Sequence, residues 1–490
     1  VRKMEGSRRA SWFDLVPAAK ASLKIFDFDE QKEKIFFDTV TDFKISQKGD
    51  TVLIRSGNSL HLLSTKDAPT KENIKQPKPC KESGNIDLSR IRIPIEPVQE
   101  WQQMYAEAWR LQRDHFWVEN MSGVDWKKVY NRYFPLIERV GSRSEFSDLM
   151  WEMQGELGTS HAYEMGGDYR PSHSYNLGFL GADLKFDEKQ SVFIIEKIIK
   201  GDTWDIDNQS PFLRPGIQAE VGMIIRDING NKVDKKNPPE KFLINASGTE
   251  IQINLAKKST SQLVHLKTLQ DETILRYRDW VETNRNYIHK KTKQKAGYVH
   301  IPDMGPDGYA EFHRYFLTEI ERDGLVVDVR YNRGGHISQL LLRKLAQKRL
   351  GYDITRWMGI GPYPMEAPAG PMVALTNEYA GSDGDIFSHS WKLMNLGKLI
   401  GRRTWGGVIG IWPRNSLVDG TLTSQPEFSF WFKDVGWGVE NYGTDVDEEI
   451  HITPKDYRND NDRQLNRGIE IVLKELKVKG SVLKTNFKNK

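Results

Sequence analysis

The sequence predicts a multidomain α+β protein that ends in an α/β module with a mostly parallel sheet. Its 490 residues are enough for three or four domains, each with a core of its own. The residue pattern changes along the chain, from short strands to helices, back to strands, and then to alternating strands and helices. Alternation of strand and helix is typical of a parallel sheet whose crossover connections are helices.

The composition indicates folded modules and gives no sign of a nucleic-acid partner. Hydrophobic residues make up 38% of the chain, and the 71 Lys and Arg exceed the 67 Asp and Glu by only four. No run of about 18 apolar residues is present, so we expect no membrane partner. The single cysteine, Cys80, excludes an internal disulfide and a cysteine-based zinc site. We expect neither a metal nor a cofactor.

Residues 1–65 contain short strand-like runs separated by turns. This part resembles one blade of a β-propeller, and a closed propeller needs at least four blades. We therefore expect a blade remnant, with the native chain continuing upstream of Val1. Residues 66–97 carry several prolines and little periodicity, which predicts a linker.

Residues 98–172 predict a helical subdomain with three amphipathic helices. The third helix is expected to begin with Ser144 as its cap and to end before Gly158. Ser160 and His161 follow this helix directly, so we expect them on a loop that the helices hold in place.

Residues 173–267 return to short strands and resemble a PDZ domain in two stretches, 176–181 and 213–233. The first stretch is a glycine-containing loop whose N–H groups could bind a peptide carboxylate. The second contains Asn229-Gly230, a strong hairpin signal. The remaining predicted segments are a helical linker over 268–297, the α/β core over 298–476 and a basic tail over 477–490.

A serine in the α/β core lies where an expected strand, residues 372–376, turns into an expected helix, residues 386–396. This geometry would expose the hydroxyl of Ser382 and direct the first N–H groups of the helix towards its target. The simpler interpretation is a serine that only caps the helix. A base nearby is needed before the turn indicates catalysis.

Histidine is the usual base for a serine nucleophile, and two of the eleven histidines are good candidates. His161 has Ser160 beside it. His451 follows Ser382 and Glu440 in the chain order of the α/β-hydrolases.

Two further histidines could line a cleft: His300 beside a strand, and His336 in a glycine loop. The hydrolase interpretation is weakened by Ala380, because the Gly-x-Ser-x-Gly turn of that fold needs glycine there.

Four motifs resemble one family. They are DGLVVDVRYNRGGHISQ (323–339), NEYAGSDGD (377–385), RTWGGVIG (403–410) and GVENYG (438–443). Together they are similar to the tricorn branch of the tail-specific proteases, a resemblance that covers about residues 97–476. In that family a helical unit, a PDZ domain and an α/β core occur in this order. The resemblance implies a cytoplasmic serine peptidase that acts on unfolded peptides and assembles into a homo-oligomer, commonly a hexamer.

The resemblance also implies a catalytic tetrad. Ser382 matches the nucleophile and His161 the base. Ser160 would bond the far nitrogen of the imidazole, and Glu440 would polarise that serine. The relay makes chemical sense because the imidazolium needs a fixed acceptor on its second nitrogen.

Other positions are assigned supporting roles. The N–H groups of Gly335 and Asp383 would form the oxyanion hole, and Gly406 and Gly407 would dock the substrate in extended form. Asp353 matches the position that selects a basic residue before the scissile bond. Two alternatives stay open: an esterase that uses Ser382, Glu440 and His451, and an inert scaffold whose PDZ domain binds peptides.

Overall fold

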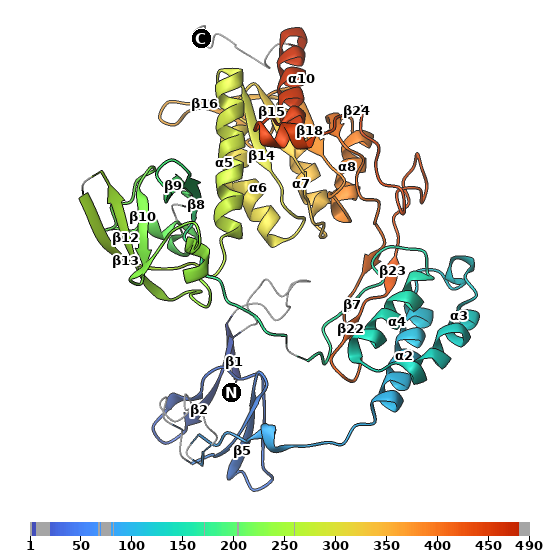
Figure 1. Cartoon of the computed structure of the whole chain (residues 1–490). Coiled ribbons are helices and arrows are strands. Elements are labelled where there is room, and N and C mark those ends of the chain that lie inside the picture. The colour runs from blue at the N-terminus through green and yellow to red at the C-terminus, as the bar shows by residue number, and fades with distance from the viewer. Residues whose placement is uncertain are drawn as a thin grey trace. The chain divides into compact units, whose positions relative to one another are not determined.

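A computed structural model of the chain describes residues 2–5, 20–66, 69, 80–81, 83–170, 172–202, 205–258 and 260–479 (Figure 1). The chain divides into two compact units. The first comprises Val1–Asp168 and Ile411–Phe428, and the second comprises Tyr169–Gly410 and Ser429–Lys490. The expected linker over 66–97 and the expected tail over 477–490 lie partly outside the described residues.

The N-terminal strands of the first unit form antiparallel sheets with the orders β1-β2-β3 and β4-β5-β6. Their bounds are β1 (Arg2–Glu5), β2 (Lys20–Asp27), β3 (Lys32–Phe37), β4 (Asp42–Ile45), β5 (Thr51–Ser56) and β6 (Ser59–Ser64). Apolar side chains such as Phe37 and Ile54 form a small buried cluster. That these strands are the remnant of a propeller blade stays a prediction.

The helical part of the first unit contains the three predicted helices, α2 (Pro97–His115), α3 (Trp126–Tyr133) and α4 (Arg143–Gly155). Their apolar stripes meet in one buried cluster. The expected cap of α4 was wrong. Ser142, not Ser144, has the extended backbone of an N-cap and accepts the N–H of Glu145, because Ser144 already lies in the first helical turn.

Residues 411–428 complete the first unit with short strands. β7 (Glu164–Met165) pairs with β22 (Leu422–Thr423), which pairs with β21 (Asn415–Ser416). A buried ion cluster supports this sheet: the guanidinium of Arg143 donates to Glu164 at 2.7 Å and to Asp419 at 2.8 Å. The further short strands are β20 (Gly410–Ile411) and β23 (Pro426–Phe428).

The PDZ region is an antiparallel sheet with the order β13-β12-β10-β9-β8, to which β11 is added beside β10. Its strands are β8 (Ala182–Asp187), β9 (Val192–Ile198), β10 (Ile224–Ile228), β11 (Asn231–Lys232), β12 (Glu250–Lys257) and β13 (Thr260–Lys267). The hairpin turn falls at Asn229-Gly230 as predicted, with φ of 51° and 75°.

The glycine-containing loop of the PDZ region uses its N–H groups inside the domain. Gly178 donates to the carbonyl of Leu243 at 2.9 Å, and Phe179 donates to the carbonyl of Leu269 at 3.0 Å. These two N–H groups therefore cannot bind a peptide carboxylate unless the loop rearranges.

The α/β core has a parallel sheet with the order β14-β15-β18-β19-β24. The strands are β14 (Ala296–His300), β15 (Gly324–Asp328), β18 (Met372–Thr376), β19 (Gly397–Gly401) and β24 (Glu448–Glu449). The helices are α5 (Thr273–Thr292), α6 (Pro306–Glu319), α7 (Ser338–Leu345), α8 (Asp383–Leu393), α9 (Pro454–Arg458) and α10 (Arg463–Lys479). The residue pattern predicts a helix from Ile337 to Leu350, and α7 ends five residues earlier, at Leu345.

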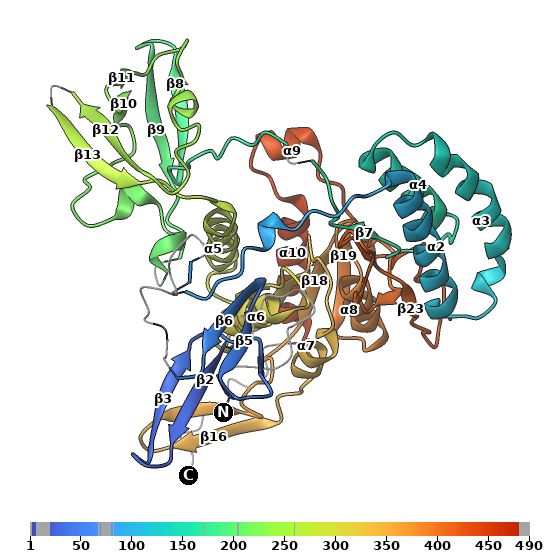
Figure 2. The same ribbon diagram turned by 90° about the horizontal axis from the view of Figure 1, so that it is seen from below.

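Helices cover both faces of this sheet (Figure 2). Alternate residues of each strand point to opposite faces, and on β15 Val327 packs with α6, α7 and α8 while Val326 packs with α5 and α10. Burial on both faces explains why the central strands are apolar throughout. The hairpin of β16 (Gly351–Thr355) and β17 (Gly359–Tyr363) projects from the core (Figures 1 and 2).

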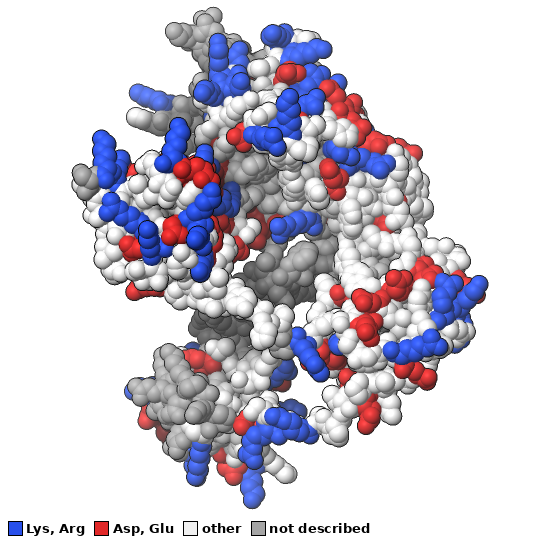
Figure 3. Space-filling view, in the orientation of Figure 1, with Lys and Arg blue, Asp and Glu red and all other residues white. Residues whose placement is uncertain are grey.

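The surface carries mixed charge. On the face shown in Figure 3, Lys and Arg are interspersed with Asp and Glu. Within the described residues, no helix is both long enough and apolar enough to cross a membrane.

Candidate active site

Ser382 lies at the junction of β18 and α8, as the sequence predicts, and its backbone is strained. It is the N-cap residue of α8 with φ 56° and ψ −122°, a conformation that non-glycine residues rarely adopt. Its hydroxyl makes no capping hydrogen bond. The simple capping interpretation is therefore wrong, because a capping serine accepts an N–H of the first turn.

The glycine loop after β15 packs directly against Ser382. A Cβ atom on Gly334 would lie 2.5 Å from the Cβ of Ser382, and one on Gly335 would lie 2.0 Å from the carbonyl oxygen of Met304. Both positions therefore require glycine. Two hydrogen bonds hold the backbone of Gly334 in place. Asn332 Oδ1 accepts the N–H of Gly334 at 2.9 Å, and Met304 donates its N–H to the Gly334 carbonyl at 2.7 Å.

Asp383, the first residue of α8, joins this helix to α7. Its carboxylate accepts the N–H of Ser338 at 2.9 Å and a hydrogen bond from the Ser338 hydroxyl. Burial raises the pKa of Asp383, while the bonds from Ser338 act in the opposite direction. The expected oxyanion donors, Gly335 and Asp383, thus lie on segments that one carboxylate holds together.

Ser160 and His161 lie in the first unit, after α4. Ser160 Oγ is 2.8 Å from Nδ1 of His161, and His161 is a buried residue with φ 65°. If Nδ1 donates its proton to Ser160, the lone pair of the ring is on Nε2. The predicted pairing of these two residues is therefore present, in an orientation that makes Nε2 the basic nitrogen.

Ser424 holds the His161 loop, and sequence reasoning missed it. Its hydroxyl donates to the carbonyl of His161 at 2.6 Å and accepts the N–H of Tyr163 at 2.8 Å. The buried amide of Gln112 on α2 donates to the Ser424 carbonyl at 2.9 Å and to Gln154 of α4 at 2.8 Å. Two helices therefore fix the histidine loop through one serine.

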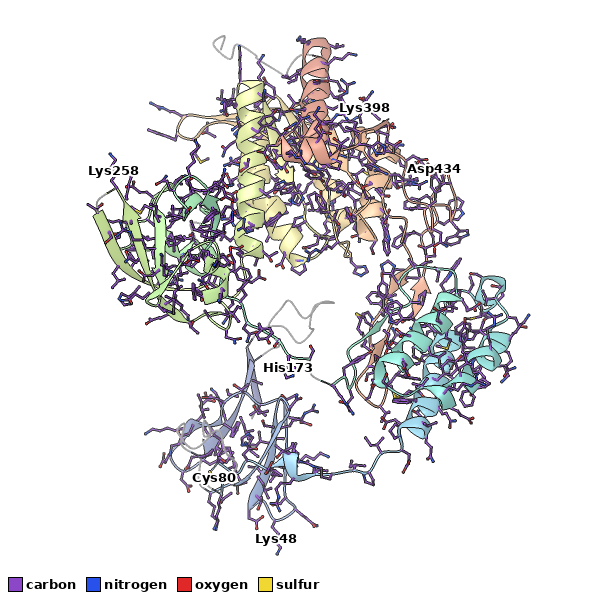
Figure 4. All side chains as sticks on the ribbon, viewed as in Figure 1. Lys48, Cys80, His173, Lys258, Lys398 and Asp434 are labelled. Atoms are coloured by element: carbon purple, nitrogen blue, oxygen red, sulfur yellow. The ribbon has the colours of Figure 1, made fainter. Side chains whose placement is uncertain are left out.

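Glu440 belongs to the second unit and binds two consecutive N–H groups. Its Oε2 accepts the N–H of Val408 at 2.6 Å and of Ile409 at 3.0 Å. The loop that leads to Glu440 is tied to α8, where Nε2 of His389 is 3.0 Å from Oδ1 of Asp434 (labelled in Figure 4). These bonds connect the segment around Glu440 to α8, the helix that Ser382 precedes.

Gly406 and Gly407 do not offer free N–H groups. They donate to the two oxygens of the Asp385 carboxylate at 2.8 Å and 3.3 Å. Docking of an extended substrate on these donors, as expected from the family resemblance, would require both bonds to break. The glycines instead join α8 to the segment that Glu440 binds.

Asp353 lies on the projecting hairpin and is exposed. The same hairpin carries exposed apolar side chains, since Ile354, Trp357 and Met358 are 57%, 87% and 87% exposed. Exposed apolar groups in such number are typical of an interface.

Family models match the three main modules of the chain. The tricorn protease C1 domain matches residues 97–155, the tricorn protease PDZ domain matches residues 178–271 and peptidase family S41 matches residues 295–450. A crystal structure of the tricorn protease is similar with a TM-score of 0.87 and 37% identity, over 97% of this chain and 45% of that one. The chain belongs to the tricorn branch of peptidase family S41.

Curated tricorn relatives agree with this assignment. The chain is 41% identical over 452 residues to the tricorn protease of Thermoplasma volcanium, covering 92% of this chain and 43% of the relative. It is 42% identical over 454 residues to a tricorn protease homolog of Saccharolobus solfataricus, covering 93% and 42%. The chain therefore spans less than half the length of these tricorn relatives.

The other candidate histidines of this tricorn-branch chain have different surroundings. His451 is exposed, and its ring contacts Arg402 at 3.0 Å and Glu449 at 3.2 Å. His300 is buried between the Tyr277 hydroxyl at 2.9 Å and the Arg330 carbonyl at 3.0 Å, and burial lowers its pKa. Burial likewise lowers the pKa of His336, beside the glycine loop. The described residues contain no cluster of His, Cys, Asp or Glu arranged to hold a metal ion.

Proposed function

We propose that this chain is the catalytic part of a tricorn-type serine peptidase, with Ser382 as nucleophile and His161 as base. The observation that carries the proposal is the strained backbone of Ser382, whose hydroxyl is not used to cap α8. Strain of this kind persists only where the surrounding structure imposes it, and it is common at nucleophiles on strand-to-helix turns.

The reaction proceeds by acyl transfer. The Ser382 Oγ attacks the carbonyl carbon of the scissile peptide, and its proton moves to Nε2 of His161. The C–N bond of the tetrahedral intermediate then breaks, and the imidazolium gives the proton to the leaving amine. Water, activated by the same imidazole, hydrolyses the ester and restores the serine.

The oxyanion of the tetrahedral intermediate is bound by the N–H groups of Gly335 and Asp383. Support comes from the glycine loop, which packs on Ser382, and from the Asp383–Ser338 bonds that join the two donor segments. Loss of one such donor typically costs about 3 kcal/mol of transition-state stabilisation.

Ser160 and Glu440 complete the tetrad. Ser160 holds the Nδ1 side of His161 at 2.8 Å, which fixes the tautomer. Glu440 polarises the Ser160 hydroxyl, and its negative charge acts on the imidazolium through that serine.

The substrates are unfolded peptides that are cut after basic residues, and Asp353 selects the side chain. A carboxylate accepts hydrogen bonds from Lys or Arg and disfavours apolar side chains. Because Asp353 is exposed on a hairpin with exposed apolar residues, we assign it to the pocket of a neighbouring copy in a homo-oligomer, a hexamer by the family resemblance. Specificity would then depend on assembly.

Labelling with an organophosphonate tests the nucleophile. We expect one adduct, mapped to Ser382 by peptide mass spectrometry, with loss of peptidase activity in proportion to labelling. Ser382→Ala should take up no label. Labelling at another serine would refute the assignment, and full labelling of Ser382 without loss of peptidase activity would refute the function.

A further inference from the structure

A run of consecutive backbone N–H groups in the α/β core is bonded throughout. Thr404 donates to the Thr444 carbonyl at 3.2 Å, and Trp405 donates to the Ala380 carbonyl at 3.0 Å. The next two N–H groups, of Gly406 and Gly407, bind Asp385, and the following two, of Val408 and Ile409, bind Glu440. The carboxylates of Asp385 and Glu440 therefore bind adjacent parts of one short segment, residues 404–409. We call it the bridge segment.

Asp385 connects the bridge segment to the nucleophile. It lies in the first turn of α8, three residues after Ser382, and is completely buried. The Ser382 N–H and the Thr404 hydroxyl also act on this carboxylate, and both lower the pKa of Asp385. Asp385 has the position of the acidic residue in a capping box, three residues after the N-cap, so it lies close to Ser382 along the chain while its carboxylate bonds to the bridge segment.

The bridge segment packs closely against neighbouring backbone at its two glycines. A Cβ atom on Gly406 would lie 2.6 Å from the backbone nitrogen of Gly443, and the Gly406 carbonyl accepts the N–H of Asn441 at 2.7 Å. A Cβ on Gly407 would lie 2.3 Å from the ring of Trp405. The glycines allow backbone to contact backbone, and the N–H groups that bind Asp385 and Glu440 belong to consecutive residues, so we expect a displacement at Asp385 to reach the N–H groups that hold Glu440.

We propose that Asp385 is a positioning residue that sets the place of Glu440 relative to Ser382 through the bridge segment. The proposal rests on the proposed function, in which Glu440 and Ser382 belong to one tetrad. Asp385 touches neither substrate nor the reacting atoms; it acts through Gly406, Gly407 and the carboxylate of Glu440.

Protonation gives a way to weaken this connection without mutation. Burial raises the pKa of Asp385 to about 7, against the opposing effect of its hydrogen bonds. The groups that face its carboxylate are neutral, namely the Thr404 hydroxyl and the N–H groups of Ser382, Gly406 and Gly407. The carboxylates of Asp383 and Glu440 bind other groups: Asp383 accepts the N–H of Ser338, and Glu440 accepts the N–H groups of Val408 and Ile409. The bonds to the bridge segment are stronger when Asp385 is ionised.

A double-mutant cycle between Asp385→Asn and Glu440→Gln tests the proposal. At pH 8 we expect Asp385→Asn to lower kcat about tenfold with KM changed less than about twofold. In the Glu440→Gln background the same change should lower kcat less than about twofold, since Glu440 no longer contributes its charge. The loss from Asp385→Asn should shrink at pH 6, where native Asp385 is itself mostly protonated. A purely structural role predicts no such dependence on Glu440 or on pH.

Asp447→Asn is the matched control. Asp447 accepts the N–H of Leu399 at 2.8 Å in the same core but outside the bridge segment. Its effect should be equal in both backgrounds. Thermal unfolding verifies that each variant is folded at the assay temperature, and Asp385→Ser, a smaller substitution, repeats the cycle if Asp385→Asn does not fold.

Equal losses from Asp385→Asn in both backgrounds would overturn the positioning role. Ser382→Ala, measured in parallel, separates this result from a failure of the proposed function. Peptidase activity that survives Ser382→Ala refutes the function itself, whereas an inactive Ser382→Ala with an additive cycle refutes only the role of Asp385.

Discussion

The carboxylate of Asp383 binds both the backbone N–H and the hydroxyl of Ser338, and thereby fastens the first residue of α8 to the first residue of α7. Ser338→Ala keeps the N–H bond and removes the hydroxyl bond to a buried acid. We expect a loss of about 1 to 3 kcal/mol in the free energy of unfolding. We also expect a lower kcat at unchanged KM, because the oxyanion donors move apart. Urea unfolding and steady-state kinetics measure both, and a higher KM at unchanged kcat would contradict the prediction.

His161→Ala should reduce peptide turnover by several orders of magnitude, whereas His451→Ala should leave most of it. His161 is buried with Ser160 on its Nδ1, while His451 is exposed between Arg402 and Glu449. In other serine proteases, removal of the catalytic base lowers kcat by several orders of magnitude. The reverse result in peptide hydrolysis assays would favour an esterase-like site built on His451.

Ser424→Ala should slow the enzyme without touching a catalytic group. The variant loses the bonds to the His161 carbonyl and the Tyr163 N–H, so the histidine loop gains freedom. We expect about a tenfold lower kcat and an equally slower reaction of Ser382 with an organophosphonate. Ser144→Ala, in the first turn of α4, is the control, and the prediction fails if both variants lose activity alike.

Asp353→Ala should relax the preference for basic residues. Peptides that differ only in the residue before the scissile bond are compared as kcat/KM for wild type and variant. Wild type should prefer Arg and Lys over Leu, and the variant should lose that preference while it still cleaves. Cleavage after Leu as readily as after Arg by wild type, or an Arg preference that survives the substitution, would remove Asp353 from this role.

Stability should fall as the pH rises from about 4 to 7, with Asp385 as one cause. The pKa of Asp385 is about 7 in the folded protein and near 3.8 in the unfolded chain, so the folded state binds more protons in this window. The contribution amounts to about 4 kcal/mol over the whole window. Asp385→Asn should flatten this part of the stability curve, measured by urea unfolding from pH 4 to 8. An unchanged slope would show that Asp385 does not titrate there.

The position of Ser382 could be predicted because local sequence determines it: an apolar strand, a glycine turn and a helical repeat are adjacent in the chain. The pairing of Ser160 with His161 was equally accessible, since the two are neighbours. Asp385 also left a signal, because Ser382 and Asp385 have the spacing of a capping box. The two N–H groups that it binds lie about twenty residues later, and no local pattern indicates them.

Ser424 illustrates what the sequence could not indicate. Its partner His161 is 263 residues away, and a single serine between short strands has no distinctive pattern. The N–H groups of Gly178 and Phe179 show a related limit of sequence patterns. The loop motif suggested a binding site, but whether N–H groups are available depends on the tertiary contacts with Leu243 and Leu269.

Residues 411–428 leave the second unit and return to it after supplying β21, β22 and Ser424 to the first. The first unit is therefore discontinuous in sequence and cannot be excised as one fragment. A truncation after Asp168 would keep His161 but strip away the strands that pair with β7 and the serine that holds the histidine loop. Deleting residues 411–428 would likewise remove the strands that pair with β7, together with Ser424. Any attempt to reconstitute the protein from separately expressed halves must therefore keep this eighteen-residue excursion with the helices.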